Sequence, residues 1–184
     1  MIAIGSLPFR PIVALQGASS AAIQTTLADF AACMKARGIR VAGVVEINGD
    51  CGGGACGRLA LRDLATDAII PISQDLGAGS TACNLDPRGL AEACATVERT
   101  IARGVDLIVL SKFGKMEAAR GGLIDAFGAA LLAGVPIVTA VAPSMTQAWT
   151  DFAGDYAQFI DVAADSLDAW WSRVTEPAAS VEAA

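Results

Sequence analysis

A serine and a lysine follow directly on a strongly apolar segment in the stretch DLIVLSKFGKMEAARGG, which spans residues 106–122. Residues 105–110 predict a buried strand, so Ser111 and Lys112 stand at its carboxyl end, where ligands of parallel sheets bind. An ammonium group there suits an anion. We therefore predict an anion site in which Lys112 faces the ligand and Lys115 and Glu117 position the loop. The alternative is a solvent-facing lysine that only ends a strand.

A second candidate is the turn LQGASSAAIQTT, between a predicted strand over 11–17 and a helix. A phosphate-binding loop of the form G-x-x-x-x-G-K-[ST] uses backbone amides, a lysine and a magnesium-binding hydroxyl. Counted from Gly17, this chain has Ala22, Ile23 and Gln24 where glycine, lysine and serine or threonine belong. The lysine is missing, but free N–H groups and the helix dipole still favour an anion. An ordinary capped turn is the alternative, and the candidate ligands are Gly17, Ala18, Ser19 and Ser20.

A third segment, SQDLGAGSTAC, is rich in glycine and hydroxyl groups. Consecutive amides in such a loop can form a concave anion site. The candidate residues are Ser73, Gly77, Gly79, Ser80 and Cys83. The thiol of Cys83 fits a nucleophile, a soft ligand or simple filler.

The five cysteines suggest no disulfide framework, because their number is odd and we find no export signal. Cys33 and Cys94 lie in helical patterns and are expected to be small buried side chains. Cys51 and Cys56 lie in the loop DCGGGACG, where two thiolates cannot complete a tetrahedral zinc site. They fit either metal or soft-anion ligands completed by another thiol, or incidental thiols in a mobile loop.

Composition limits the class of protein. The 184 residues are 54% hydrophobic and 17% charged, which is typical of an α/β domain with a buried parallel sheet. A net charge of −6 argues against a nucleic-acid surface, and the absence of histidine excludes Ser-His-Asp and Cys-His triads. No apolar run reaches the roughly 18 residues of a membrane span. The start shows no signal peptide, so we expect a cytoplasmic protein.

The elements that would position these groups follow an α/β order. The first helix begins at Ser19 or Ser20 and stops at Gly38, and Asp86 with Pro87 caps the second. Ser144 and Gln147 predict a capping box for a later helix. The other expected strands are 39–46, 58–61, 68–73, 105–110, 134–141 and 158–162, and the later helices are 122–133, one carrying Trp149 and Phe152, and 165–173.

This order predicts a three-layer α/β domain over residues 1–174, with a mostly parallel sheet, an inserted hairpin and a loose tail over 175–184. Trp170 and Trp171 are adjacent on the last helix. We expect that they cannot both face the same core, so one would serve a subunit contact in a homo-oligomer.

Several blocks resemble a known family. FGKME resembles the segment after the acidic pair of THEP-type nucleoside triphosphatases. RLALRDL, ISQDLGAGSTACNLDP, DLIVLSKFGKMEA and GVPIVTAV resemble more closely the bacterial domain-of-unknown-function family twenty-four seventy-eight, which is associated with molybdate transport. The resemblance covers about residues 12–160 and implies a P-loop-NTPase-like fold. Ser111 and Lys112 stand where the triphosphatases have Asp-Glu, so magnesium-dependent hydrolysis is disfavoured.

Three functions fit these observations. The favoured one is an anion- or nucleotide-binding protein on a degenerate P-loop fold, an accessory or sensor in molybdenum metabolism. Its ligand would be a nucleotide or a tetrahedral oxyanion held without magnesium, and Lys112 would replace the lost lysine and metal. The alternatives are an active nucleoside triphosphatase with an altered site, and a structural or interaction subunit with a partner in molybdate handling.

Overall fold

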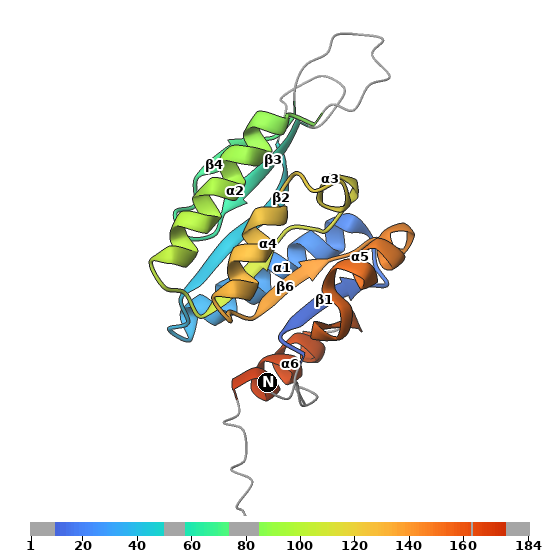
Figure 1. The fold of residues 1–184 in the computed structure, drawn as a ribbon. Coiled ribbons are helices and arrows are strands. Elements are labelled where there is room, and N and C mark those ends of the chain that lie inside the picture. Colours follow the sequence, from blue (N-terminus) through green and yellow to red (C-terminus); the bar gives the residue numbers. More distant parts are fainter. Residues whose placement is uncertain (1–9, 50–57, 74–84, 163, 176–184) are drawn as a thin grey trace, which may run out of the picture.

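The short apolar runs predicted as strands form one seven-stranded sheet in the computed structural model, which describes residues 10–49, 58–73, 85–162 and 164–175 (Figure 1). The strands are β1 Ile12–Gln16, β2 Val41–Gly49, β3 Arg58–Asp63, β4 Ile69–Pro71, β5 Leu107–Leu110, β6 Ile137–Ala140 and β7 Ala157–Asp161. The helices are α1 Ser20–Ala36, α2 Pro87–Ala102, α3 Lys115–Ala118, α4 Ile124–Leu132, α5 Thr146–Ala153 and α6 Ala164–Thr175, with short 3-10 helices η1 Pro143–Met145 and η2 Gly154–Tyr156.

The sheet has the order β4-β3-β2-β5-β6-β1-β7. Only β3 runs against its neighbours, and the other neighbouring pairs are parallel. The predicted mostly parallel α/β fold with an inserted hairpin is therefore confirmed. β5 does not adjoin β1, because β6 pairs with both and lies between them. Lys112 directly follows β5, so it leaves the sheet two strands away from β1 and the turn that follows it.

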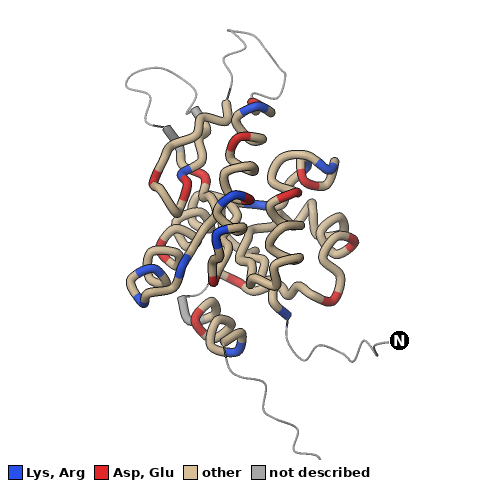
Figure 2. The backbone as a smooth tube through the Cα atoms, turned by 60° about the vertical axis from the view of Figure 1, so that its left-hand side comes forward, with Lys and Arg blue, Asp and Glu red and all other residues tan. Residues whose placement is uncertain are grey.

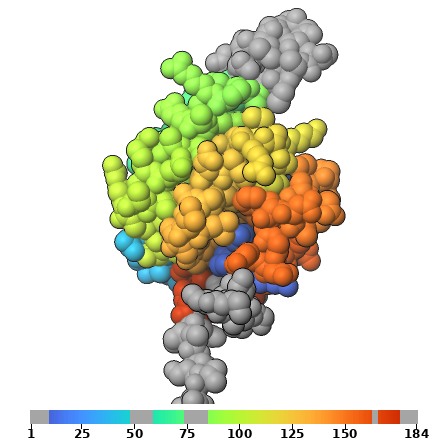
Figure 3. Space-filling view, viewed as in Figure 1, coloured from blue at the N-terminus to red at the C-terminus, as the bar shows by residue number. Residues whose placement is uncertain are grey.

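Helices cover both faces of the sheet (Figure 1). One buried cluster joins the sheet to α1 and α6, and the other joins it to α2, α4 and α5. The latter helices lie side by side on the face seen in Figure 3. Because β5 and β6 are buried on both faces, they are continuous apolar runs rather than alternating ones.

The two tryptophans of α6 correct one expectation. Trp170 and Trp171 are 0% and 4% exposed and belong to the same buried cluster, so the expected subunit contact for one of them is wrong. An apolar helical stripe of about 100° is wide enough for adjacent residues. Trp170 also donates from Nε1 to the Arg10 carbonyl at 3.2 Å. Of the predicted tail, only Thr175 is described, and it ends α6.

The helix caps confirm two predictions and contradict a third. Ser19 is the N-cap of α1, and Asp86 caps α2 by accepting from the Arg88 N–H. The capping box predicted for Ser144 and Gln147 is wrong, because Ser144 lies inside η1 and α5 has no side-chain cap.

The cysteines of the helices differ in burial. Cys94 is buried as expected, and burial raises the pKa of its thiol. Cys33 is exposed, so its predicted burial is wrong: the buried face of α1 is formed by its neighbours Ala31 and Met34. Among the described residues, no helix is both long and apolar enough to cross a membrane. In the view of Figure 2, basic and acidic residues are interspersed along the described backbone.

Candidate functional site

At the carboxyl ends of β1 and β6 the chain leaves the sheet towards opposite faces. β1 continues into α1 on one face, and β6 continues through η1 into α5 on the other. In open α/β sheets the crevice at such a point is the usual ligand site. A cavity of about 490 Å³ lies here, which we call the switch-point cavity; its lining consists of residues 16–20, residues 140–143, Ile23, Gln24 and Lys112.

The N-terminus of α1 forms one wall of the switch-point cavity. The Ser19 Oγ accepts a hydrogen bond from the Ala22 N–H at 3.2 Å, and the Ser19 carbonyl accepts from the Ile23 N–H at 3.0 Å. Ser20 and Ala21 precede this first intrahelical bond, so their N–H groups have no acceptor within the helix. With the helix dipole, this end of the 17-residue α1 favours a negative charge.

Gly17 makes the turn between β1 and α1 possible. Its φ of 86° is a left-handed conformation, and a Cβ there would lie 2.8 Å from the Asp161 Oδ1. Asp161 ends β7, on the side of β1 away from β6. Its negative charge therefore favours an anion on the opposite side of the cavity, towards Lys112.

Lys112 lines the same cavity as the Gly17–Ser20 turn, although it follows β5. Its ammonium does not point freely at the turn: the Nζ donates to the Glu46 Oε2 at 2.6 Å. The Lys112 side chain is 43% exposed and that of Glu46 is 11% exposed. The cation is therefore held at the cavity wall by a mostly buried carboxylate from within β2.

Two positions of the phosphate-loop pattern have structural roles in this chain. Ile23, where the lysine would stand, is 7% exposed and packs in the core beneath α1. Gln24, where the magnesium-binding hydroxyl would stand, is 8% exposed. Its Nε2 donates to the Ser111 carbonyl at 2.7 Å, and its Oε1 accepts from the Glu46 N–H at 2.8 Å. Gln24 thus ties α1 to Glu46 of β2 and to Ser111, which directly follows β5.

Gln24 and Glu46 were not among the predicted site residues. A signal for Gln24 was present, since a glutamine at a buried position of an amphipathic helix needs hydrogen-bond partners. Glu46 carried a weaker signal in the sequence. A glutamate at the end of a predicted strand is common, and its partner Lys112 lies 66 residues away in sequence.

The FGKME motif mainly builds the loop after β5. Phe113 packs edge-on against Phe127 and Trp149. Glu117 is 6% exposed, and its two carboxylate oxygens accept from the N–H groups of Gly114 and Leu123, both at 2.9 Å. Glu117 thus holds the loop between Gly114 and Leu123. Ser111, Lys115 and Glu117 do not belong to the lining of the switch-point cavity.

The third predicted segment is only partly described. Ser73 pairs with Leu85 beyond β4, at the edge of the sheet, and four strands separate β4 from β1. Ser73 therefore does not join the cavity. Gly77, Gly79, Ser80, Cys83, Cys51 and Cys56 lie outside the described residues. Within the described part of the chain, no group of three or more His, Cys, Asp or Glu side chains could hold a metal ion.

Comparisons with known proteins identify the family. Residues 12–170 match the family described as protein of unknown function DUF2478, and the chain belongs to it, as the motifs predicted. The chain is 41% identical, over 149 residues, to a Bradyrhizobium diazoefficiens protein named molybdenum import ATP-binding protein ModC 2. The match covers 81% of this chain but only 17% of that relative. No solved structure matches the chain.

Proposed function

We propose that this chain binds a small anionic ligand, an oxyanion or the phosphate group of a nucleotide, in the switch-point cavity. The observation that carries the proposal is the meeting of the α1 N-terminus and Lys112 on one cavity. Both supply hydrogen-bond donors and positive charge, and they come from segments more than 80 residues apart in the sequence. The negative charge of Asp161 beside Gly17 opposes an anion at that end of the turn, so the proposed position of the anion is nearer Lys112.

Binding does not require Lys112 to leave Glu46 entirely. An ammonium group has three donors, and the ion pair with the Glu46 Oε2 uses one of them. A second donor can serve the anion while the carboxylate keeps its partner. This arrangement supports a ligand held by amides and one lysine, without a metal.

The same geometry speaks against ordinary magnesium-dependent hydrolysis. The positions of the lysine and of the hydroxyl are taken by Ile23 and Gln24, both buried. Ser111 and Lys112 supply no carboxylate for a metal at the end of β5. Since phosphoryl transfer depends on positioning and charge stabilisation by such groups, we propose a binding rather than a hydrolytic role.

The relative suggests the biological setting. A protein named for molybdenum import and ATP binding contains a segment 41% identical to this chain. We propose that the chain acts as an accessory or sensor in molybdate handling. A tetrahedral oxyanion suits a cavity that offers backbone amides and a single cation.

Calorimetry and thermal shift test the proposal. The ligands are phosphate, sulfate, molybdate, ATP and ADP, each with and without magnesium. The wild type is compared with Lys112→Ala and with Lys35→Ala, an exposed lysine at the other end of α1 that serves as the matched control. A ligand at about 100 times its Kd adds about 2.7 kcal/mol to the stability.

We expect one class of anion to bind and to raise the melting temperature without magnesium. Lys112→Ala should weaken this binding about tenfold, whereas Lys35→Ala should leave it unchanged. Phosphate release that disappears in Lys112→Ala would instead favour the triphosphatase. If no anion binds or changes the melting temperature, the proposal is contradicted and the interaction subunit becomes the favoured function.

A further inference from the structure

The two faces of the β3–β4 hairpin are covered unequally. Leu61 of β3 and Ile70 of β4 belong to the buried cluster that joins the sheet to α2, α4 and α5. The cluster on the opposite face, with α1 and α6, contains no residue of β3 or β4. Within the described part of the chain, no helix packs its buried residues on the α1 side of this hairpin.

This uncovered surface is apolar apart from one charged residue. Ile69 is 53% exposed, and Pro71 is exposed as well. Exposed apolar patches of this kind mark interaction sites. Strand pairing places the side chains in two rows across β2, β3 and β4, which together we call the hairpin face: Val45, Arg62 and Ile69 in one row, and Ile47, Ala60 and Pro71 in the other.

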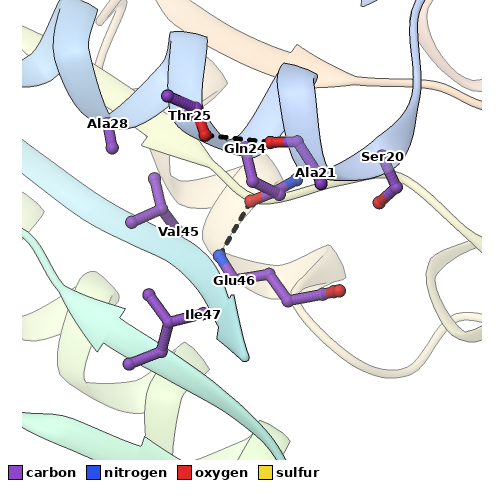
Figure 4. A pocket seen from close by; sticks show the side chains of 8 residues that line it. All are labelled: Ser20, Ala21, Gln24, Thr25, Ala28, Val45, Glu46 and Ile47. Atoms are coloured by element: carbon purple, nitrogen blue, oxygen red, sulfur yellow. Dashed lines mark hydrogen bonds between the residues drawn. The ribbon is translucent and has the colours of Figure 1, made fainter. Parts of the chain in front are cut away.

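A cavity separates the hairpin face from α1. Its volume is about 530 Å³, and it lies between α1 and β2 (Figure 4). In Figure 4, Ala28 of α1 stands on one side of it, and Val45 and Ile47 of β2 stand on the other. The hairpin face and the neighbouring side of α1 are thus open along one continuous groove.

Arg62 gives the hairpin face a charge requirement. Its Nε is buried, and it has no hydrogen-bond partner in the part of the chain that the structure describes. None of the ion pairs between described residues includes Arg62. Because a buried donor without an acceptor costs free energy, an occupant that brings a carboxylate to Arg62 is favoured.

The outer face of α1 is also uncovered. α1 has two charged residues among 17, Asp29 and Lys35, whereas α2 has four among 16. Its other exposed positions carry small side chains, among them Ala22, Thr25 and Ala32. A surface helix usually carries charged and polar residues on the face that points away from the core. The composition of α1 therefore indicates a second packing surface.

We infer that a second copy of this chain covers both surfaces in a two-fold symmetric dimer. Each α1 lies on the hairpin face of the other copy, and the two α1 helices lie side by side between the two sheets. Symmetry uses this interaction twice, so it gives a helix to each hairpin face and a cover to each α1. The inference is separate from the proposed anion site and does not depend on it.

Charge complementarity favours the second copy as the occupant. Asp29 is exposed and is the acidic residue of α1, and Arg62 is the unpaired base of the hairpin face. In a two-fold dimer of this kind, Asp29 of each copy faces the hairpin of the other. The same contact that covers the apolar rows therefore supplies the carboxylate.

The heights of the two groups along the sheet agree with this pairing. Gln24 of α1 bonds to the Glu46 N–H, so these residues lie at about the same height. From there α1 runs back along the strands, and Asp29 lies about 7.5 Å farther on. Val45 lies about 3.3 Å from Glu46 in the same direction and pairs with Arg62. A two-fold axis parallel to the strands keeps these heights, so the two charged groups differ by only about 4 Å in height.

Sedimentation velocity and light scattering test the dimer on the full chain, from micromolar to near-millimolar concentration. The expected species has twice the 18.7 kDa mass of the chain. Ile69→Lys places a charge on the hairpin face and should weaken dimerisation at least about tenfold, because symmetry repeats the change. The matched control is Leu132→Lys, which should leave dimerisation unchanged: Leu132 is 92% exposed and ends α4, on the other side of the sheet.

A charge exchange identifies the pair. Asp29→Arg and Arg62→Glu should each weaken dimerisation at least about tenfold, because like charges then face each other at two symmetric places. Both substitutions in one chain should restore the affinity to within about threefold of the wild type. Circular dichroism and the melting temperature of each variant show that it is folded.

The outcomes decide the inference. A dimer that Ile69→Lys weakens, Leu132→Lys leaves intact and the charge exchange restores supports it. A monomer at every concentration overturns it and leaves the hairpin face to a different protein. A dimer that Ile69→Lys does not weaken, or that the charge exchange does not restore, overturns it as well.

Discussion

Gln24 provides the sharpest test of the structure, because one buried side chain joins three elements. Gln24→Leu keeps the volume but removes both of its hydrogen bonds, to the Ser111 carbonyl and from the Glu46 N–H. Two backbone groups are then left unpaired at the strand ends. Each net hydrogen bond contributes about 1 kcal/mol, and a buried unpaired group costs about 1–3 kcal/mol. Since leucine recovers part of this by apolar burial, we expect a loss of about 2–4 kcal/mol.

Urea unfolding monitored by tryptophan fluorescence measures this loss. In a chain of this size, 1 kcal/mol corresponds to about 2–4 °C in Tm, so the melting temperature should also fall by about 5–15 °C. The matched control is Gln147→Leu. This exposed glutamine donates only to Asp151 on its own helix, and its replacement should change stability by less than about 0.5 kcal/mol.

Gln24→Glu gives a second, pH-dependent readout. One carboxylate oxygen still accepts from the Glu46 N–H, but the other faces the Ser111 carbonyl and needs a proton to donate to it. The pKa of the new carboxyl is therefore raised in the folded state. Its stabilising contact is present below the unfolded pKa and is lost as the pH rises through the folded pKa. If Gln24→Leu costs less than about 1 kcal/mol and the cost of Gln24→Glu does not vary with pH, the reasoning is refuted.

Two further predictions concern groups outside the cavities. The Glu117 carboxylate accepts hydrogen bonds from the N–H groups of Gly114 and Leu123, and Glu117→Gln turns an amide N–H₂ towards one of them. The loss of stability in urea unfolding should be about 2–3 kcal/mol. A loss near zero would mean that water replaces the carboxylate. The Arg40 guanidinium lowers the pKa of Asp106 to about 2, so this pair stabilises the fold above about pH 4 and stops doing so as the pH falls to about 2. Because the pair is exposed, Asp106→Asn should cost less than about 1 kcal/mol at pH 7, and the difference from wild type should vanish towards pH 2 in a denaturation series; a difference independent of pH would contradict the ion-pair origin.

Local pattern was enough to predict most of the elements. The Asp86-Pro87 helix start and the Ser19 cap rest on backbone geometry within a few residues, and the structure confirms both. The hairpin after β2 was predicted because two short strand-like pieces lay between turn signals. Trp171 was misjudged because the width of a buried helical stripe depends on the shape of the surface beneath it, which local pattern does not contain.

The order of the strands and the pairing of Lys112 needed tertiary information. β5 and β6 are both short apolar runs buried on both faces, so nothing in their residues distinguishes which one neighbours β1. Lys112 was predicted as a cation at a strand end because it follows an apolar run, and in the structure it lines the same cavity as the α1 turn. Its carboxylate partner follows from the pairing of β2 with β5, a contact between segments about 66 residues apart.

The residues at the lysine, hydroxyl and acidic positions of the phosphate-loop pattern have structural roles in this chain. Ile23 fills the core beneath α1, Gln24 ties α1 to β2 and β5, and Lys112 neutralises Glu46. A lysine in place of Ile23 would put an ammonium in an apolar cluster, and a serine in place of Gln24 would leave the Ser111 carbonyl and the Glu46 N–H unpaired. Either single substitution is therefore expected to lower the stability of the fold. The contacts of Gln24 and Lys112 therefore hold the walls of the switch-point cavity in place.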